Sequence, residues 1–516
     1  MPSVKLTPQE LDLALAFVRE HGASEFFPYP PELRAIEACW DKVRPVLERV
    51  DLLCHEPRPA FELMAPKARY GVRLAHILDP VDTLLVAGLL ARLAPAVEQA
   101  RPPLSAGTVF SFRVSCDEER PFFLRTDFEG YHQKLRKKTR ASKFVARTDI
   151  VDFFPRVYHH PLENAVQATT HQTHETSALM RLLSAWSHGT SYGIPTGPAV
   201  SNLLAEALLI EVDQFLTSHS VDFLRIVDDY FIFGETEADC RKALFSLASR
   251  LQESQGLSLN MAKTGVMKSD EFAVAVLWTE DPDRALRDKI RSRVFGGNPY
   301  AQVDYDKLTA AQKKIVDEMD ARRMLEKALE TDAVDLSAVR FVLNVLTALR
   351  RPDLVSPILD SLDRLAPVSN AVARFLNVFD QVESTDRVHI GQRLLDYARR
   401  AEFVPDYQIV WLLEPFTQSE KWDNLTDLRV IARDNANEFV RRQAILGLGQ
   451  IGDRSALLDQ KGRYDAARDW EQRAILFACR RLPTDEREAL YRRLRVSGDW
   501  SISNLLTKAL VAYSRM

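Results

Sequence analysis

The 516-residue chain has few cysteines, and none of them stands in a metal-binding or disulfide pattern. The five cysteines are odd in number, lie far apart and include no CxxC pair: Cys39, Cys54, Cys116, Cys240 and Cys479. This spacing argues against a zinc ribbon and against a disulfide-stapled secreted domain. We therefore expect buried thiols in a reducing compartment.

The sequence is also expected to lack a membrane-spanning segment and a secretory leader. No apolar run is predicted to reach the length that spans a bilayer, and the start, MPSVKLTPQELDL, lacks the basic-then-apolar layout of a secretory signal. These features predict a cytoplasmic protein without a membrane partner.

The chain also lacks a strong excess of one charge. Its net charge of −4, its charged fraction of 27% and its hydrophobic fraction of 46% are typical of a globular protein. Basic residues nevertheless gather in YHQKLRKKTRASKFVART, which contains no acid: Lys134, Arg136, Lys137, Lys138, Arg140, Lys143 and Arg147. Such a run is most often a solvated surface, but its place directly before the main motif favours phosphate contact.

The length favours two or three domains. Periodicity predicts a helical segment over residues 1–60, mixed helices and strands over 61–295, and helices over 300–516. A Gly-Gly-Asn-Pro cluster at 296–299 marks the last boundary. The predicted fold class is therefore α+β.

Weak internal similarity is present in the helical part. The segment AVRFVLNVLTALRR at Ala338 recurs loosely at Ala371, and the Ala-Ile-Leu of 444–446 recurs at 474–476. Spacings of roughly 30 residues are typical of stacked helix pairs. The segment FVRRQAILGLGQIGD resembles a HEAT repeat, and an irregular helical bundle is the alternative.

The segment RIVDDYFIFG places Asp228 and Asp229 at the predicted turn of a hairpin. A second predicted strand, over 143–154, carries Asp149. If both lie in one sheet, Asp149 and Asp228 meet at the same edge. Adjacent carboxylates repel each other unless a cation lies between them, and hard oxygen ligands suit Mg²⁺. Two such ions would activate an attacking hydroxyl and stabilise the leaving oxygen of an in-line displacement.

Four segments, in this order, resemble the palm motifs of reverse transcriptases: TDIVDFFPRVY, GIPTGPAVSNLLAE, RIVDDYFIFG and GLSLNMAKTGV. Upstream, APKARYGVRLAHILDP is similar to the basic fingers motif. GTVFSFRVS resembles a segment typical of bacterial abortive-infection and related "unknown group" reverse transcriptases, which carry C-terminal helical repeats in place of a thumb. The resemblance implies a fingers-palm domain with an antiparallel sheet over 61–295, followed by an all-α, HEAT-like domain.

The resemblance also implies roles for single residues. Asp149, Asp228 and Asp229 would be the catalytic carboxylates that bind two Mg²⁺ ions, with Mn²⁺ as an alternative. Phe154 would abut C2′ of the sugar and select deoxynucleotides, although a phenylalanine there is as often core. The residues implied in nucleotide binding are Lys67, Arg69, Arg73, Phe154, Gly193, Gly197 and Lys263.

Two positions depart from the family pattern. Ile226 stands where an aromatic residue is usual, and Thr196 stands where a glutamine is usual. Both positions lie near primer or template in the family, so ordinary template copying is in doubt.

The implied function is DNA synthesis from dNTPs in antiphage defence by abortive infection. Some relatives make DNA without a template and start it on a protein tyrosine; the candidates here are Tyr397, Tyr407, Tyr464, Tyr491 and Tyr513. Expected partners are dNTPs, a single-stranded DNA product, an RNA template and further copies of the chain in a homo-oligomer. The alternatives are a retroelement reverse transcriptase that copies its own RNA, and an inactive palm that serves as a scaffold for nucleic acid or protein.

Overall fold

The computed structural model describes residues 2–67, 71–115, 122–277, 282–295, 305–330, 334–348, 350–351, 354–378, 384–400, 403–494 and 498–516. The chain forms two compact units. The first comprises Met1–Glu25, Glu48–Phe61 and His76–Ala301, and the second comprises Phe26–Leu47, Glu62–Ala75 and Gln302–Met516.

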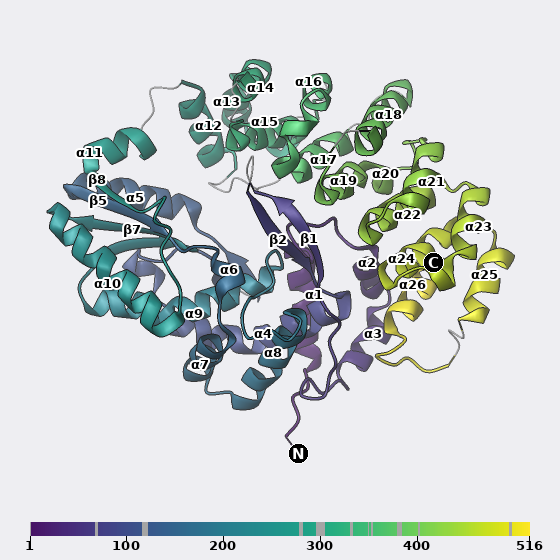
Figure 1. Ribbon diagram of the computed structural model, residues 1–516, viewed down its shortest axis with the longest axis horizontal. Coiled ribbons are helices and arrows are strands. Elements are labelled where there is room, and N and C mark those ends of the chain that lie inside the picture. Colours follow the sequence, from purple (N-terminus) through teal and green to yellow (C-terminus); the bar gives the residue numbers. More distant parts are fainter. Residues whose placement is uncertain are drawn as a thin grey trace. The chain divides into compact units, whose positions relative to one another are not determined.

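A four-stranded antiparallel sheet organises the first unit (Figure 1). Its strands, in spatial order, are β6 (Asp222–Ile226), β7 (Asp229–Gly234), β5 (Phe144–Asp149) and β8 (Gly265–Lys268). The predicted hairpin over 222–234 is therefore confirmed, and the strand that carries Asp149 lies directly beside it.

Apolar side chains cover both faces of this sheet. On one face, α5 (Phe128–Ala141) contributes Tyr131 and Leu135 to a cluster with Val145, Phe231 and Phe233. The helices α9 (Ala199–Ser218) and α10 (Glu237–Gln255) also pack against the sheet. Paired residues of antiparallel strands share a face, and Val145 pairs with Phe233. The face covered by α5 is therefore also the face of Asp149 and Asp229.

One helix, α4 (Pro80–Ala100), is long and apolar enough by composition to cross a membrane. Its most apolar window is 83% buried inside the structure, where it packs against α1 (Pro8–His21), α7 and α9. The expectation that no apolar run has this length was wrong, because a helix buried on all sides has the composition of a membrane span. The remaining elements of the first unit are η1 (Leu104–Ala106), β3 (Arg113–Ser115), β4 (Phe123–Arg125), α6 (Phe153–Arg156), α7 (His159–Thr170), α8 (Thr173–Trp186), α11 (Ser269–Phe272), η2 (Ala273–Leu277) and α12 (Pro282–Arg293).

The strand predicted over 143–154 was too long. It ends at Asp149, because Asp152 takes a left-handed conformation (φ 43°) and α6 follows. The next residue, Ile150, forms a single bridge with Leu259. The segment GTVFSFRVS contains the short strand Arg113–Ser115.

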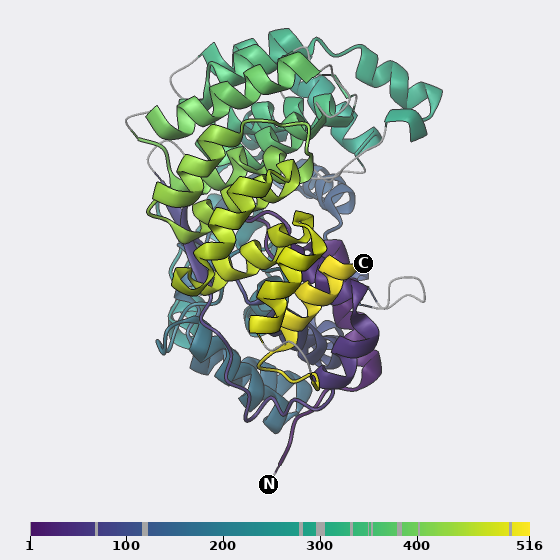
Figure 2. The ribbon, with the colours of Figure 1, turned by 90° about the vertical axis from the view of Figure 1, so that its right-hand side faces the viewer.

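The second unit consists mainly of helices, drawn in green to yellow from α13 onward (Figures 1 and 2). Helices close in sequence pack against each other, for example α15 on α17, α22 on α24 and α24 on α26. From residue 305 onward the described part of the chain contains no strand, as predicted. HEAT-like repetition remains a prediction.

The elements of the second unit from residue 305 are η3 (Tyr305–Lys307), α13 (Ala310–Asp317), α14 (Ala321–Glu330), α15 (Leu336–Ala348), α16 (Val355–Leu359), η4 (Leu362–Arg364), η5 (Ala366–Val368), α17 (Ser369–Asn377), α18 (Ser384–Arg400), α19 (Asp406–Leu412), α20 (Glu414–Gln418), α21 (Leu425–Asp434), α22 (Glu438–Ile451), α23 (Arg454–Gly462), η7 (Tyr464–Ala466), α24 (Asp469–Ala478), η8 (Cys479–Arg481), α25 (Thr484–Arg493) and α26 (Leu505–Arg515).

The helices of the first 60 residues divide between the two units. Helix α1 packs against α4, whereas α2 (Pro31–Ala38) and α3 (Trp40–Leu47) pack against α26. The hairpin of β1 (Phe61–Pro66) and β2 (Val72–Ile77) lies mostly within the second unit. Compact units of this chain are therefore not continuous in sequence.

Candidate active site

The turn between β6 and β7 consists of two residues, Val227 and Asp228. Ile226 pairs with Asp229 across the hairpin, so Asp228 occupies the turn itself and Asp229 begins β7. Val227 has a φ of 58°, in the left-handed region that β-branched residues rarely adopt. The aspartate pair therefore sits on a tight and strained turn.

Asp149, at the end of β5, meets this turn. It is directly opposite Asp229 in the register of β5 and β7, and the Ile150 backbone N–H donates to the Asp228 carbonyl at 3.2 Å. The structure thus brings Asp149, Asp228 and Asp229 together at one edge of the sheet, as the sequence predicted.

Asp149 is buried, Asp228 and Asp229 are half-buried, and the three carboxylates repel one another. Burial, followed by the charges of Asp229 and Asp149, raises the pKa of Asp228 to about 6. Burial also raises the pKa of Asp229, although Arg147 opposes that shift. Asp149 is only 6% exposed, and its Oδ1 atom has no hydrogen-bond partner among the described residues. This edge therefore holds more negative charge than the protein itself neutralises.

Two basic side chains partly offset this charge. Lys263 Nζ lies 2.5 Å from Asp149 Oδ2, and Arg147 Nη2 lies 3.9 Å from Asp229 Oδ1. Both basic side chains are about half exposed. Among the described residues, Lys263 and Arg147 form the ion pairs of Asp149 and Asp229.

The carboxylates suit a divalent cation that takes further ligands from elsewhere. Within the described ranges, no group of three His, Cys, Asp or Glu side chains is arranged as a complete metal site. The buried Asp149 Oδ1, which has no partner among the described residues, and the neighbouring carboxylates of Asp228 and Asp229 fit a divalent cation. Carboxylate oxygens completed by phosphate and water ligands are the usual surroundings of Mg²⁺.

The two predicted glycines of GIPTG both need to be glycine. Gly193 has a φ of 92° and Gly197 a φ of 121°, which side-chain-bearing residues rarely adopt. Gly193 N–H donates to the Val157 carbonyl at 2.8 Å, and Ile194 N–H donates to the Phe154 carbonyl at 3.0 Å. These bonds tie the glycine loop to the segment that follows β5. A role of the two glycines in nucleotide binding remains a prediction.

Phe154 lies in α6 and not in a strand, five residues after Asp149, and it is half-buried beside Phe153. Lys67 is exposed after β1, and Arg73 in β2 lies over the Phe26 ring at 5.3 Å. Both basic residues belong to the second unit, and Arg69 lies outside the described residues. Their nucleotide-binding roles remain predictions.

Sequence reasoning missed several residues near the carboxylates. Arg147 was named in the basic run before the main motif, but its place beside the aspartates was missed: it is two residues before Asp149 and thus on the same face of β5. Glu206 and Asp213, seven residues apart on one side of α9, both bind the buried Arg225 of β6. That spacing was the signal for a polar stripe inside an otherwise apolar helix.

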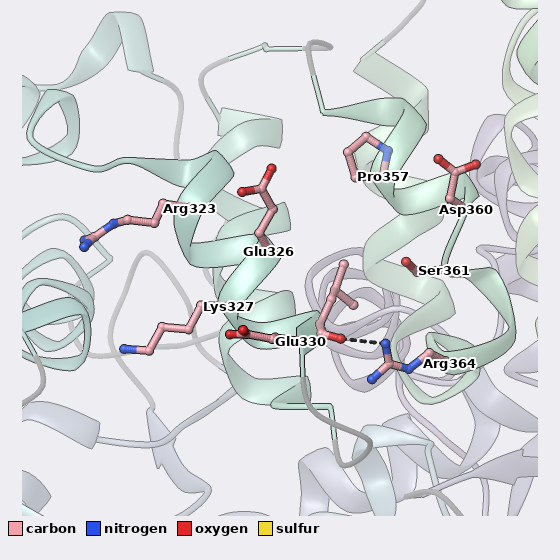
Figure 3. A pocket seen from close by; sticks show the side chains of 9 residues that line it. Arg323, Glu326, Lys327, Glu330, Pro357, Asp360, Ser361 and Arg364 are labelled. Atoms are coloured by element: carbon pink, nitrogen blue, oxygen red, sulfur yellow. Dashed lines mark hydrogen bonds between the residues drawn. The ribbon is translucent and has the colours of Figure 1, made fainter.

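A separate open groove of about 700 Å³ lies in the second unit, between α14 and α16 (Figure 3). Its charged residues are mixed in sign, and Arg364 Nη1 donates to the Leu329 carbonyl at 2.6 Å. Because acids and bases alternate along it, the groove concentrates neither sign of charge.

Comparisons with known proteins agree with the geometry of the first unit. Residues 73–277 match the family described as "Reverse transcriptase (RNA-dependent DNA polymerase)". No curated protein matches the chain. Solved telomerase structures align at low similarity. The truncated apo telomerase from Candida tropicalis is 13% identical, with a TM-score of 0.31, over 41% of this chain and 51% of that chain. The chain therefore spans about half the length of this first match.

Two longer telomerase structures align over more of the chain. Apo telomerase from Candida tropicalis is 9% identical, with a TM-score of 0.36, over 69% of this chain and 68% of that one. Telomerase from Candida albicans in complex with a fragment of telomeric RNA is 10% identical, with a TM-score of 0.32, over 70% and 67%. The match of residues 73–277 to the reverse transcriptase family covers the sheet, the glycine loop and the three aspartates.

Proposed function

We propose that this protein is a DNA polymerase of the reverse transcriptase type that joins dNTPs with the help of two divalent metal ions. The observation that carries the proposal is the meeting of Asp149 with Asp228 and Asp229 at one sheet edge, inside a matched reverse transcriptase domain. Asp149 and Asp228 are the proposed metal ligands, and Asp229 is the third, less direct carboxylate.

Mg²⁺ is the proposed metal, and Mn²⁺ is the alternative. Such ions, when bound, lower the pKa of the attacking hydroxyl and stabilise the leaving oxygen of an in-line displacement. The ionised carboxylate of Asp228 is needed to bind them, and its raised pKa is the consequence of keeping it in a buried and acidic place. The ionised form of Asp228 is thus destabilised in the metal-free protein, and a bound cation would stabilise it.

The remaining residues of the site act on the nucleotide. Lys263 is half exposed and pairs with Asp149. When a metal ion binds Asp149, the Lys263 ammonium group is free to contact the triphosphate, and this is its proposed role. Phe154 is the proposed barrier to a 2′-hydroxyl. Gly193 and Gly197 keep the neighbouring loop free of side chains where a base pair would approach. Lys67 and Arg73 are further proposed phosphate contacts, and so is Arg69, which lies outside the described residues.

The direct test is nucleotide incorporation by the purified full-length protein with Mg²⁺ and labelled dNTPs, with and without an RNA template. We expect incorporation by the wild type and none by Asp228→Asn. Asp222→Asn is the matched control, because Asp222 begins β6 in the same hairpin, lies on the surface and binds Lys138. If the wild type is inactive under all these conditions, the proposal is wrong.

A template-copying activity is the second candidate, because the matched family is described as RNA-dependent. Comparing incorporation with and without RNA separates the two. Product that requires RNA and is complementary to it would favour a conventional reverse transcriptase. Product made without RNA would favour template-independent synthesis, in spite of the family description.

Antiphage defence and protein priming are further parts of the proposal. The resemblance of GTVFSFRVS to abortive-infection enzymes supports them. Among the tyrosines considered for priming, Tyr407, Tyr464 and Tyr491 are buried, whereas Tyr397 and Tyr513 are half-buried. Priming in this conformation therefore favours the last two. The test is covalent labelling of the protein by a radioactive dNTP, followed by Tyr397→Phe and Tyr513→Phe.

A further inference from the structure

A buried ionic network lies directly beneath the turn that carries Asp228. Its members come from four segments of the first unit: Arg101 after α4, Ser111 before β3, Glu206 and Asp213 in α9, and Arg225 in β6. All five are between 0% and 3% exposed. Two positive and two negative side chains are thus enclosed with almost no access to water.

The network is closely bonded. Arg225 donates through Nε to Asp213 Oδ1 at 2.9 Å and through Nη2 to Glu206 Oε2 at 2.9 Å. Arg101 Nη2 donates to the same Glu206 oxygen at 2.6 Å, and Ser111 Oγ donates to Glu206 Oε1 at 2.6 Å. Glu206 is therefore the centre on which two guanidinium groups and a hydroxyl converge.

Arg101 extends this network to Glu98 and to the Phe112 carbonyl, and two other side chains of the network, Ser111 and Arg225, bond to the backbone of Val227. Val227 N–H donates to Ser111 Oγ at 2.8 Å, and the Val227 carbonyl accepts from Arg225 Nη1 at 2.9 Å. Both polar groups of one peptide residue are thus held by buried side chains. Val227 is also the residue whose φ of 58° is strained, and Asp228 follows it directly.

The segment before β3 is itself held against β6. Arg225 N–H donates to the Thr108 carbonyl at 2.7 Å, and Phe110 N–H donates to the Arg225 carbonyl at 3.3 Å. Ser111 is therefore placed by backbone bonds and does not depend on Val227 for its position. Because Ser111 is fixed, its hydroxyl can hold the Val227 N–H and so keep Val227 in the left-handed conformation.

A purely stabilising role explains this arrangement poorly. Removing charges from water is costly, and apolar side chains of similar volume are often as stable as a buried ion pair. A β-branched residue in the left-handed region adds backbone strain to that cost. A network that fixes the backbone geometry of the turn between β6 and β7 would account for these costs.

We propose that Ser111, Glu206 and Arg225 are positioning residues for Asp228. Ser111 and Arg225 hold Val227 in its left-handed conformation, and Glu206 holds Ser111 and Arg225. The fixed turn directs the Asp228 carboxylate towards Asp149 before any cation binds. This inference rests on the proposed polymerase function, because a preformed carboxylate pair matters only where it binds metal.

The central test removes the hydroxyl and then removes the strain. We expect Ser111→Ala to lower the incorporation rate between about ten- and a hundredfold, as small displacements of catalytic groups do. Glycine adopts positive φ without help, so Val227→Gly in the Ser111→Ala background should recover most of the loss. Because Val227→Gly also removes backbone strain, the melting temperature of each variant is measured with its rate. A rate that recovers beyond what the melting temperature explains supports positioning, and a rate that only follows the melting temperature would overturn it.

A second measurement, of metal binding, does not depend on catalytic turnover. We expect Ser111→Ala to weaken Mn²⁺ binding in the presence of dTTP several-fold, measured from the free-Mn²⁺ signal in electron paramagnetic resonance. Thr176→Val is the matched control: it removes a buried hydroxyl, in α8, that donates only to the Gln172 carbonyl of its own helix. The control should leave both rate and Mn²⁺ binding unchanged.

If Ser111→Ala does not fold, Ser111→Thr and Ser111→Val decide the matter, because they have equal volume and differ by the hydroxyl. The threonine variant should be at least several-fold more active and bind Mn²⁺ more tightly. Equal rates and equal Mn²⁺ binding in hydroxyl-bearing and hydroxyl-free variants would overturn the inference. An inactive wild type that still shows the Mn²⁺ difference would refute the polymerase proposal and keep the positioning role.

Discussion

Lys263 Nζ lies 2.5 Å from Asp149 Oδ2, at the edge of the sheet where three aspartates meet. The other oxygen of Asp149 is buried and has no partner among the described residues. The Lys263 ammonium group therefore pairs with one of the two oxygens of a carboxylate that is proposed to bind a divalent ion. The metal ion and Lys263 compete for the negative charge of Asp149. This competition should affect the binding of both the metal ion and the nucleotide.

Replacing Lys263 by methionine should affect metal and nucleotide in opposite directions. At pH 8 the variant should bind Mn²⁺ about three- to tenfold more tightly, because a neighbouring positive charge worth about 1 kcal/mol is gone. Its KM for dNTPs should rise, because the triphosphate loses a contact. Calorimetric titration with Mn²⁺ and steady-state kinetics measure the two effects.

Lys143→Met is the control for Lys263→Met. Lys143 is an exposed lysine near the start of the same strand β5, and its ion pair is with Glu235 at 3.4 Å. Removing it should change neither quantity. Weaker Mn²⁺ binding by Lys263→Met would contradict the competition between lysine and metal.

Replacing Asp228 by asparagine should abolish activity and yet stabilise the metal-free protein. Burial and the two neighbouring aspartates raise the pKa of Asp228 to about 6, above the unfolded value of about 3.9. The folded protein therefore binds this proton more tightly than the unfolded chain does. The stability contributed by the proton is fully present below about pH 4 and is lost as the pH rises through 6.

Asparagine does not lose a proton, so the gain should be pH-dependent. In EDTA at pH 8, Asp228→Asn should raise the free energy of unfolding by about 1–3 kcal/mol, and the gain should vanish near pH 4. Thermal unfolding at several pH values measures it, with the surface variant Asp222→Asn as the control. A gain that is the same at pH 4 and pH 8 would show that charge repulsion is not its cause.

The two strands that carry the aspartates were predictable from local rules, whereas their pairing in one sheet was expected from the resemblance to reverse transcriptases. Two apolar runs around Asp228 and Asp229 indicate a hairpin, and the strand with Asp149 has the same composition. The end of that strand was not predictable in the same way. Phe154 looked like a strand residue by composition, but the left-handed Asp152 ends the strand and α6 begins.

The network around Arg225 lay beyond sequence reasoning for another reason. A charged residue in a strand is expected on the surface, and its burial here depends on Glu206, Asp213 and Ser111. Ser111 and Val227 are far apart in sequence, and their contact depends on how the segment before β3 runs along β6. Pairings over such distances follow from the tertiary fold and leave no periodic signal.

Glycine at 193 and 197 should be required for backbone reasons alone. Both residues have φ values above 90°, so an alanine would be strained by roughly 1–3 kcal/mol. We expect Gly193→Ala and Gly197→Ala to lower the melting temperature and to reduce incorporation more than the lost stability explains. Gly462→Ala is the control, because an added Cβ meets nothing within 4 Å and the residue ends helix α23. Wild-type activity in both loop variants would contradict a role of this loop at the site.

Phe154 provides the test of sugar selection. If its ring abuts the 2′ position, Phe154→Ala should admit ribonucleotides, and the preference for dNTPs over rNTPs should fall by about tenfold or more, as for other steric exclusions worth 1–3 kcal/mol. The measurement is the ratio of kcat/KM for dNTP and rNTP of the same base. Phe153→Leu is the control, since Phe153 is buried next to Phe154 and contributes to the core. That control should lose stability and keep the ratio, because a core residue does not contact the sugar. An unchanged ratio in Phe154→Ala would show that Phe154 is also a core residue and that another group selects the sugar.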